Sequence, residues 1–109
     1  MQLRINVNDA DASDAIRSYV ERRLRFALSR FGQRVGQITV RIRPEGPSGN
    51  SCRIRAEVVP FGQVVVEQND SDLFMAIDRA AGKMGRQFSR ELDRIRNSRL
   101  GRESVRLAA

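Results

Sequence analysis

Four stretches of the chain alternate apolar with polar residues, and two longer stretches repeat apolar residues every three or four positions. A period of two predicts β-strands, and the longer period predicts amphipathic helices. In chain order, the six segments are 2–7, 14–31, 37–44, 51–59, 64–69 and 71–97. They predict an α+β fold of order β-α-β-β-β-α. Because each strand has one apolar face, we expect a four-stranded sheet with two helices packed on one face.

The two predicted helices have identifiable starts and apolar faces. Ser13 and Ser71 are candidate N-caps, and Gly32 can end the first helix. Three acidic residues near the second start are interpreted as caps and dipole partners rather than Mg²⁺ ligands: Asp70, Asp72 and Asp78. The apolar positions expected in the core are Ile16, Val20, Leu24, Ala27, Leu28 and Phe31, then Leu73, Ile77, Ala80, Ala81, Met84, Phe88, Leu92 and Ile95.

A chain of 109 residues is long enough for one compact domain. We assign residues 1–97 to that domain and predict a disordered tail at 98–109, where the apolar period is lost. Cys52 is expected to be buried as a small apolar residue. No apolar run approaches the roughly 20 residues of a membrane span, and the N-terminus does not look like a signal peptide, so we expect a cytoplasmic protein without a membrane partner.

The charge of the chain indicates its class of partner. There are 20 Lys and Arg residues against 13 Asp and Glu, a formal net charge of +7. All of the cations except Lys83 are arginines. An excess of this size implies a polyanionic partner, and guanidinium groups match phosphate oxygens in pairs, as ammonium groups cannot. A genome rich in G and C would explain the preference for arginine over lysine, but not the surplus of positive charge.

The second predicted helix carries the strongest candidate site, a row of five cations: Arg79, Lys83, Arg86, Arg90 and Arg94. At 100° per residue they fall within about 80° of one another, opposite the apolar stripe. Like charges at this spacing repel, and a phosphate backbone would neutralise them. The alternative is an ordinary solvated helix face, whose charges are partly compensated by Asp78, Glu91 and Asp93.

A second basic surface is expected on the uncovered face of the sheet. Its residues are secondary candidates for RNA binding: Arg41, Arg43, Arg53 and Arg55, with Arg4 on the first strand. Aromatic residues that would stack on bases are few. Phe26 and Phe61 are the two candidates, and packing at the core or its edge is the favoured interpretation of both.

The residues that most enzymes need are absent from the sequence. There is no histidine to act as a general base near neutral pH, and Cys52 therefore has no histidine partner. No cluster of Cys and His ligands and no glycine-rich phosphate loop is present. We therefore expect a protein that is not an enzyme and that uses no metal, cofactor or small-molecule substrate.

Parts of both helices resemble a known family. Residues 71–78 (SDLFMAID) and 83–88 (KMGRQF), with 15–24 (AIRSYVERRL), are similar to the ribosome hibernation-promoting factors, a family that includes ribosome-associated translation inhibitors and sigma-factor modulation proteins. The likeness covers about residues 1–97. Three features depart from the family pattern: Phe74 stands where tyrosine is usual, Gly82 and Gly85 lie within the helix, and the loop at 44–50 is rich in Gly and Pro.

The resemblance implies a bacterial, ribosome-associated domain of order β-α-β-β-β-α. Members bind the small ribosomal subunit and its RNA in the channel for mRNA and tRNA, and block translation during stress or stationary phase. Matched position by position, the residues that would contact ribosomal RNA are Lys83, Arg86 and Arg90 on the second helix and Arg22, Arg23 and Arg25 on the first. The chain would be a short form, without the additional C-terminal domain of long members.

Two other functions remain open from the sequence. One is a generic module for structured or duplex RNA, since domains with a related order of elements read RNA shape. Such domains usually place lysines at the start of the second helix, where this chain has Ser71 and Asp72. The other is a protein-interaction module that regulates transcription.

Overall fold

A computed structural model of the chain describes residues 5–7, 13–47 and 49–108. The elements, in chain order, are β1 (Ile5–Val7), α1 (Asp14–Leu28), a 3₁₀ segment (Ser29–Arg34), β2 (Val35–Glu45), β3 (Gly49–Val58), β4 (Gln63–Asp70) and α2 (Leu73–Ala108). The predicted α+β class, with two helices and three antiparallel strands, is confirmed.

The strands lie in the order β1-β2-β3-β4. The β2–β3 and β3–β4 pairs are antiparallel, and the short β1 pairs in parallel with β2, with Ile5 opposite Ile38. Residues 2–4 of the predicted first strand, including Arg4, lie outside the described residues. Strands β2 and β3 pair as far as Glu45 and Gly49, so most of the predicted loop at 44–50 belongs to a strand hairpin.

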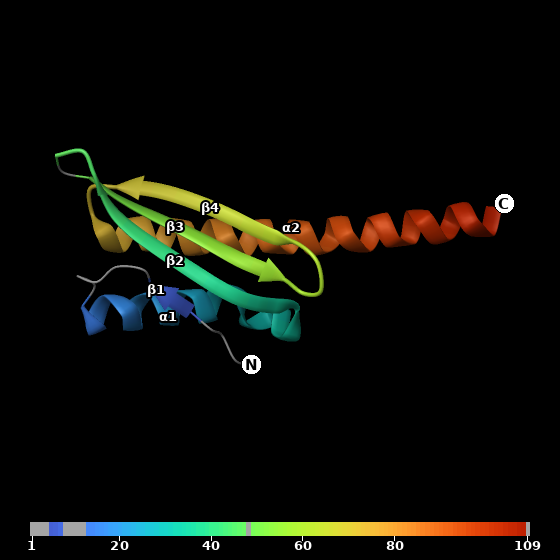
Figure 1. Cartoon of the computed structure of the whole chain (residues 1–109), viewed down its shortest axis with the longest axis horizontal. Coiled ribbons are helices and arrows are strands. Elements are labelled where there is room, and N and C mark those ends of the chain that lie inside the picture. Colours follow the sequence, from blue (N-terminus) through green and yellow to red (C-terminus); the bar gives the residue numbers. More distant parts are fainter. Residues whose placement is uncertain (1–4, 8–12, 48, 109) are drawn as a thin grey trace.

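Both helices cover the same side of the sheet, as Figure 1 shows. The core lies between them. From β3, Cys52, Ile54, Ala56 and Val58 enter this layer, while the residues between them face the other side. The helices contribute a buried stripe that matches the predicted one: Val20, Leu24 and Leu28 from α1, and Ile77, Ala80, Ala81, Met84, Phe88 and Leu92 from α2. The uncovered face of the sheet is therefore set by the same alternation that builds the core.

Helix α1 begins where the sequence predicted but ends earlier. The Ser13 side chain accepts a hydrogen bond from the Ile16 backbone N–H, as an N-cap does. The helix stops at Leu28, and the chain tightens into 3₁₀ turns with Gly32 at a φ of 56°, in the region that favours glycine. This turn carries Phe31 onto Phe88 of α2, with 4.9 Å between ring centroids.

Helix α2 differs from its prediction at both ends. Asp72 rather than Ser71 is the cap, because its carboxylate accepts a hydrogen bond from the Phe74 N–H at 2.9 Å. The helix also continues to Ala108 instead of ending near residue 97, so the predicted disordered tail is wrong over 98–108. That segment has no proline and is rich in Arg and Leu, which favour a helix. Figure 1 shows α2 projecting past the sheet.

Cys52 is fully buried, as predicted. Removal from water raises the pKa of its thiol to about 12. Within the described part of the chain, no helix combines the length and apolarity that a membrane crossing needs.

Candidate functional site

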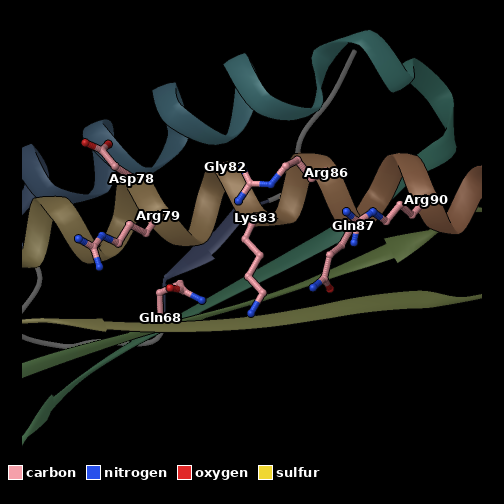
Figure 2. A pocket seen from close by; sticks show the side chains of 8 residues that line it. All are labelled: Gln68, Asp78, Arg79, Gly82, Lys83, Arg86, Gln87 and Arg90. Carbon is pink, nitrogen blue, oxygen red and sulfur yellow. The ribbon is translucent and has the colours of Figure 1, made fainter.

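Four of the five cations in the predicted α2 row line a shallow groove beside the edge strand β4: Arg79, Lys83, Arg86 and Arg90. Arg79, Arg86, Arg90 and Arg94 are exposed, and Lys83 is half-buried. The groove has a volume of about 470 Å³, and Gln68 supplies its β4 side. In Figure 2, Arg79 and Lys83 extend from α2 toward this strand, while Arg86 folds back toward Gly82. The helical spacing places these groups on one side of α2, as the sequence predicted.

Carboxylates neutralise both ends of this row. Arg79 Nη1 lies 3.7 Å from Asp70 Oδ2. Arg94 donates from Nε and Nη2 to the two carboxylate oxygens of Glu91, at 3.2 and 2.5 Å, and these bonds lower the pKa of the Glu91 carboxyl. The expectation that a phosphate backbone neutralises all five cations of the row is therefore wrong at Arg79 and Arg94, which have carboxylate partners in the protein.

The three cations in the middle of the row have no carboxylate partner among the described residues. Lys83, Arg86 and Arg90 form no ion pair with any described residue, and all three line the same groove. Three cations within two turns of one helix repel one another, and two of them, Arg86 and Arg90, are exposed to solvent. We call these three residues the α2 cation cluster. It can bind successive phosphates of a polyanion without displacing a protein carboxylate.

The three α1 candidates occupy different surroundings. Arg23 faces α2, where its Nε lies 3.0 Å from Asp78 Oδ1. Arg22 is exposed, and its guanidinium carbon lies 5.7 Å from the centre of the Tyr19 ring. Arg25 is two residues from Arg23, or about 200° around the helix, and so points away from α2. The structure therefore brings Arg22 and Arg23 toward the α2 face, but not Arg25.

Asp78 joins the two helices rather than capping one. Its Oδ1 accepts a hydrogen bond from the Tyr19 hydroxyl at 2.5 Å and also contacts Arg23. The hydrogen bond to this carboxylate raises the pKa of Tyr19. Asp72 caps α2 by accepting from the Phe74 N–H, whereas Asp70 accepts from the Asp72 N–H in the turn before the helix. The prediction of a cap is therefore right for Asp72.

Two exposed aromatic rings correct the sequence interpretation. Phe26 is 79 % exposed and Phe61 is 83 % exposed, although packing at the core was favoured for both. Phe26 lies beside a second groove, between α1 and α2, which Arg30 and Arg86 also line. Sequence reasoning missed Arg30. Its spacing of four residues from Phe26 was the available signal, since such pairs share a helix face.

The sheet arginines form a separate basic surface. Arg41, Arg43, Arg53 and Arg55 are exposed, and none is ion-paired with a described residue. Arg41 lies directly opposite Arg53 in the β2–β3 register, a pairing of like charges that destabilises an isolated sheet. Thr39, Arg41, Arg53 and Arg55 line a hollow of about 200 Å³. Because the sheet separates them from the helices, these residues do not join the α2 cation cluster.

The residues on these surfaces can bind anions. Among the described side chains, no three His, Cys, Asp or Glu residues gather in a way that would hold a metal ion. The α2 cation cluster instead offers guanidinium and ammonium groups beside the amides of Gln68 and Gln87. Such donors bind phosphate and sugar oxygens.

Comparisons with known proteins bear on the fold and the family of the chain. A family model described as sigma 54 modulation protein / S30EA ribosomal protein matches residues 3–96. The crystal structure of the Thermus thermophilus Protein Y N-terminal domain is similar, with a TM-score of 0.66 and 30 % sequence identity over 83 % of this chain and 98 % of that one. A ribosomal subunit interface protein from Coxiella burnetii has the same fold, with a TM-score of 0.69 and 16 % identity over 85 % of this chain and 99 % of the other. A search of curated proteins found no match.

Proposed function

Because the chain belongs to the sigma 54 modulation protein / S30EA ribosomal protein family, we propose that it binds the small ribosomal subunit and blocks translation by occupying the channel for mRNA and tRNA. The similar structures are described as Protein Y and as a ribosomal subunit interface protein, which supports a ribosomal partner. The proposed effect is steric and needs no chemical step. It would act during stress or stationary phase, in the cytoplasm, where ribosomes work.

The observation that carries this proposal is the α2 cation cluster. Lys83, Arg86 and Arg90 are arranged along a helix face without carboxylate partners among the described residues. Ribosomal RNA would supply the missing negative charge, and release of its counterions would drive binding. The helix holds the backbone of these residues in place, so binding orders their side chains but no further backbone.

The start of α2 argues against the generic duplex-RNA module. Asp70 and Asp72 occupy this helix end, and the Asp72 carboxylate already accepts the Phe74 N–H. A phosphate placed there would meet two negative charges instead of open N–H groups. The phosphate-binding surface therefore lies further along the helix, at the α2 cation cluster.

Co-sedimentation with purified small subunits tests the proposal. We expect the wild-type chain to sediment with them at moderate salt, and the double substitution Arg86→Glu and Arg90→Glu to abolish this. The matched control is Arg41→Glu with Arg53→Glu, which makes the same change of charge on the opposite face and should leave most binding intact. Both pairs are exposed, so circular dichroism should show a retained fold. Unchanged sedimentation of the helix variant would refute the assignment of this surface.

The blocking step needs its own measurement. Binding of initiator tRNA and mRNA to small subunits should fall as the protein is added, in proportion to the subunits it occupies. Because the proposed effect is competition for space, excess tRNA should displace the protein in turn. Full tRNA binding on subunits saturated with the protein would contradict occlusion while leaving ribosome association intact.

A further inference from the structure

A second groove lies where α1 and α2 cross, next to the α2 cation cluster. It has a volume of about 320 Å³, within the usual range for small-ligand pockets, and is lined by Phe26, Ala27 and Arg30 of α1 and Gly82, Gly85 and Arg86 of α2. At Gly85 the helices are close, since an added Cβ would lie 3.2 Å from the Ala27 carbonyl oxygen. At Gly82 an added Cβ would meet only Arg86 Nη1, at 3.5 Å. The glycines therefore bring the walls together and leave the floor without side chains.

The aromatic ring of Phe26 lies at the rim of this groove and contacts Arg23. The Arg23 guanidinium carbon lies 5.6 Å from the centre of the Phe26 ring, within the range of a cation–π contact. Arg23 is itself held by Asp78, which also binds the Tyr19 hydroxyl. The ring is 79 % exposed, so a planar group can reach it from solvent and stack on it.

Positive charge flanks the ring on both helices. Arg30 contacts the Phe31 ring, with 4.7 Å from its guanidinium carbon to the ring centre, and has no ion pair with a described residue. Arg86 lines both this groove and the groove of the α2 cation cluster. Arg86 and Gly82 therefore connect the two grooves, and a polyanion bound to Arg86 can enter either of them. An aromatic face next to guanidinium groups fits a base attached to a phosphate chain.

We propose that the groove between α1 and α2 holds one unpaired nucleobase of an RNA chain, stacked on Phe26, with the adjacent phosphates on Arg30 and Arg86. This inference rests on the proposed function, because it takes RNA as the partner. It adds base contact to a surface that otherwise recognises only the phosphate backbone. A duplex would not fill the groove, since its bases are stacked on one another and paired.

The test compares oligonucleotides of equal charge. Anisotropy of a labelled 12-nucleotide single-stranded RNA is measured against an abasic 12-mer, using the full chain. Wild type should prefer the RNA by roughly 5- to 160-fold, which corresponds to about 1–3 kcal/mol for stacking of one base on an aromatic residue. Phe26→Ala should remove this preference and leave abasic binding unchanged. Phe26→Leu, which keeps an apolar side chain without an aromatic face, should also lose most of it.

Phe61→Ala is the matched control. It removes the same side chain at similar exposure, from the β3–β4 turn instead of the groove, and should keep the preference for RNA. If Phe26→Ala binds RNA as tightly as wild type while wild type still sediments with small subunits, the groove assignment is overturned and the proposed function stands. Loss of sedimentation by wild type itself would instead refute the proposed function.

A free nucleotide has the same base and phosphate groups as one residue of RNA, so its binding is measured in a separate competition experiment. Adenosine monophosphate should displace the 12-mer only at far higher concentration than unlabelled 12-mer, because it lacks the phosphates that contact Lys83 and Arg90. Tighter binding of the mononucleotide than of the 12-mer, dependent on Phe26, would overturn the assignment to an RNA chain.

Discussion

Replacing Arg86 and Arg90 with glutamine should weaken the salt dependence of ribosome binding by a calculable amount. On the face shared by α1 and α2, five cations without ion pairs to described carboxylates are available to phosphates: Arg22, Arg30, Lys83, Arg86 and Arg90. Each phosphate neutralised contributes about −0.9 to the slope of log K against log salt, so wild type should have a slope near −4.5. Removing two contacts should reduce it to about −2.7.

The expected difference is large enough to measure. Between 50 and 200 mM KCl, a slope of −4.5 corresponds to a roughly 500-fold loss of affinity, and a slope of −2.7 to a roughly 40-fold loss. Filter binding of labelled protein to small subunits, at fixed Mg²⁺ concentration and several KCl concentrations, gives both slopes. The glutamine variants keep side-chain length and avoid the repulsion that glutamate would add.

The matched control uses the two arginines that already have partners. Arg79→Gln with Arg94→Gln removes the same number of charges from the same helix. Because Asp70 and Glu91 contact these guanidinium groups in the protein, their loss should change the slope by much less. Equal changes in slope for the two double variants would refute the division of the row into paired and unpaired cations.

Three further outcomes follow from local contacts. Tyr19 is the single tyrosine, so the absorbance at 295 nm should report its ionisation alone, with a midpoint above pH 10, and Asp78→Asn should lower that midpoint. The stability that this hydrogen bond contributes is present below pH 10 and is lost as the pH rises through the raised pKa of Tyr19. An unchanged midpoint in the variant would contradict the contact. Gly82→Ala should raise the free energy of unfolding, measured in urea, by about 0.5–1 kcal/mol, because alanine favours a helix more than glycine does. Gly85→Ala should raise it less, because the added Cβ would lie 3.2 Å from the Ala27 carbonyl oxygen. Equal increases for the two variants would contradict close contact of the helices at Gly85. The Cys52 thiol, with its pKa raised to about 12, should react with a disulfide reagent at pH 8 no faster than the protein unfolds, and rapid reaction in the native state would contradict its burial.

The local periodicity of apolar residues in the sequence predicted most of the fold. The alternation at 51–59 and the stripe containing Met84 and Phe88 both point into the core as predicted. The sequence predicted the ends of the helices less well. Helix α1 stops at Leu28 because the chain must turn into β2, and α2 continues past residue 97, where no proline interrupts it. The capping change from Ser71 to Asp72 is a shift of one residue between two side chains that can both cap.

The sequence by itself determined that Arg79, Lys83, Arg86, Arg90 and Arg94 share one helix face, because positions three and four apart lie together on any helix. The Arg94–Glu91 ion pair is also local, since the two residues are three apart on the helix. Only the tertiary structure decided that Arg79 has a carboxylate partner as well. Asp70 reaches Arg79 from β4, a contact that depends on how the strand and helix pack. The groove beside Phe26 likewise depends on where α1 crosses α2, and side chains 50 or more residues apart in the chain meet there. Periodicity reports the face of each element, whereas the partners across a face are set by packing.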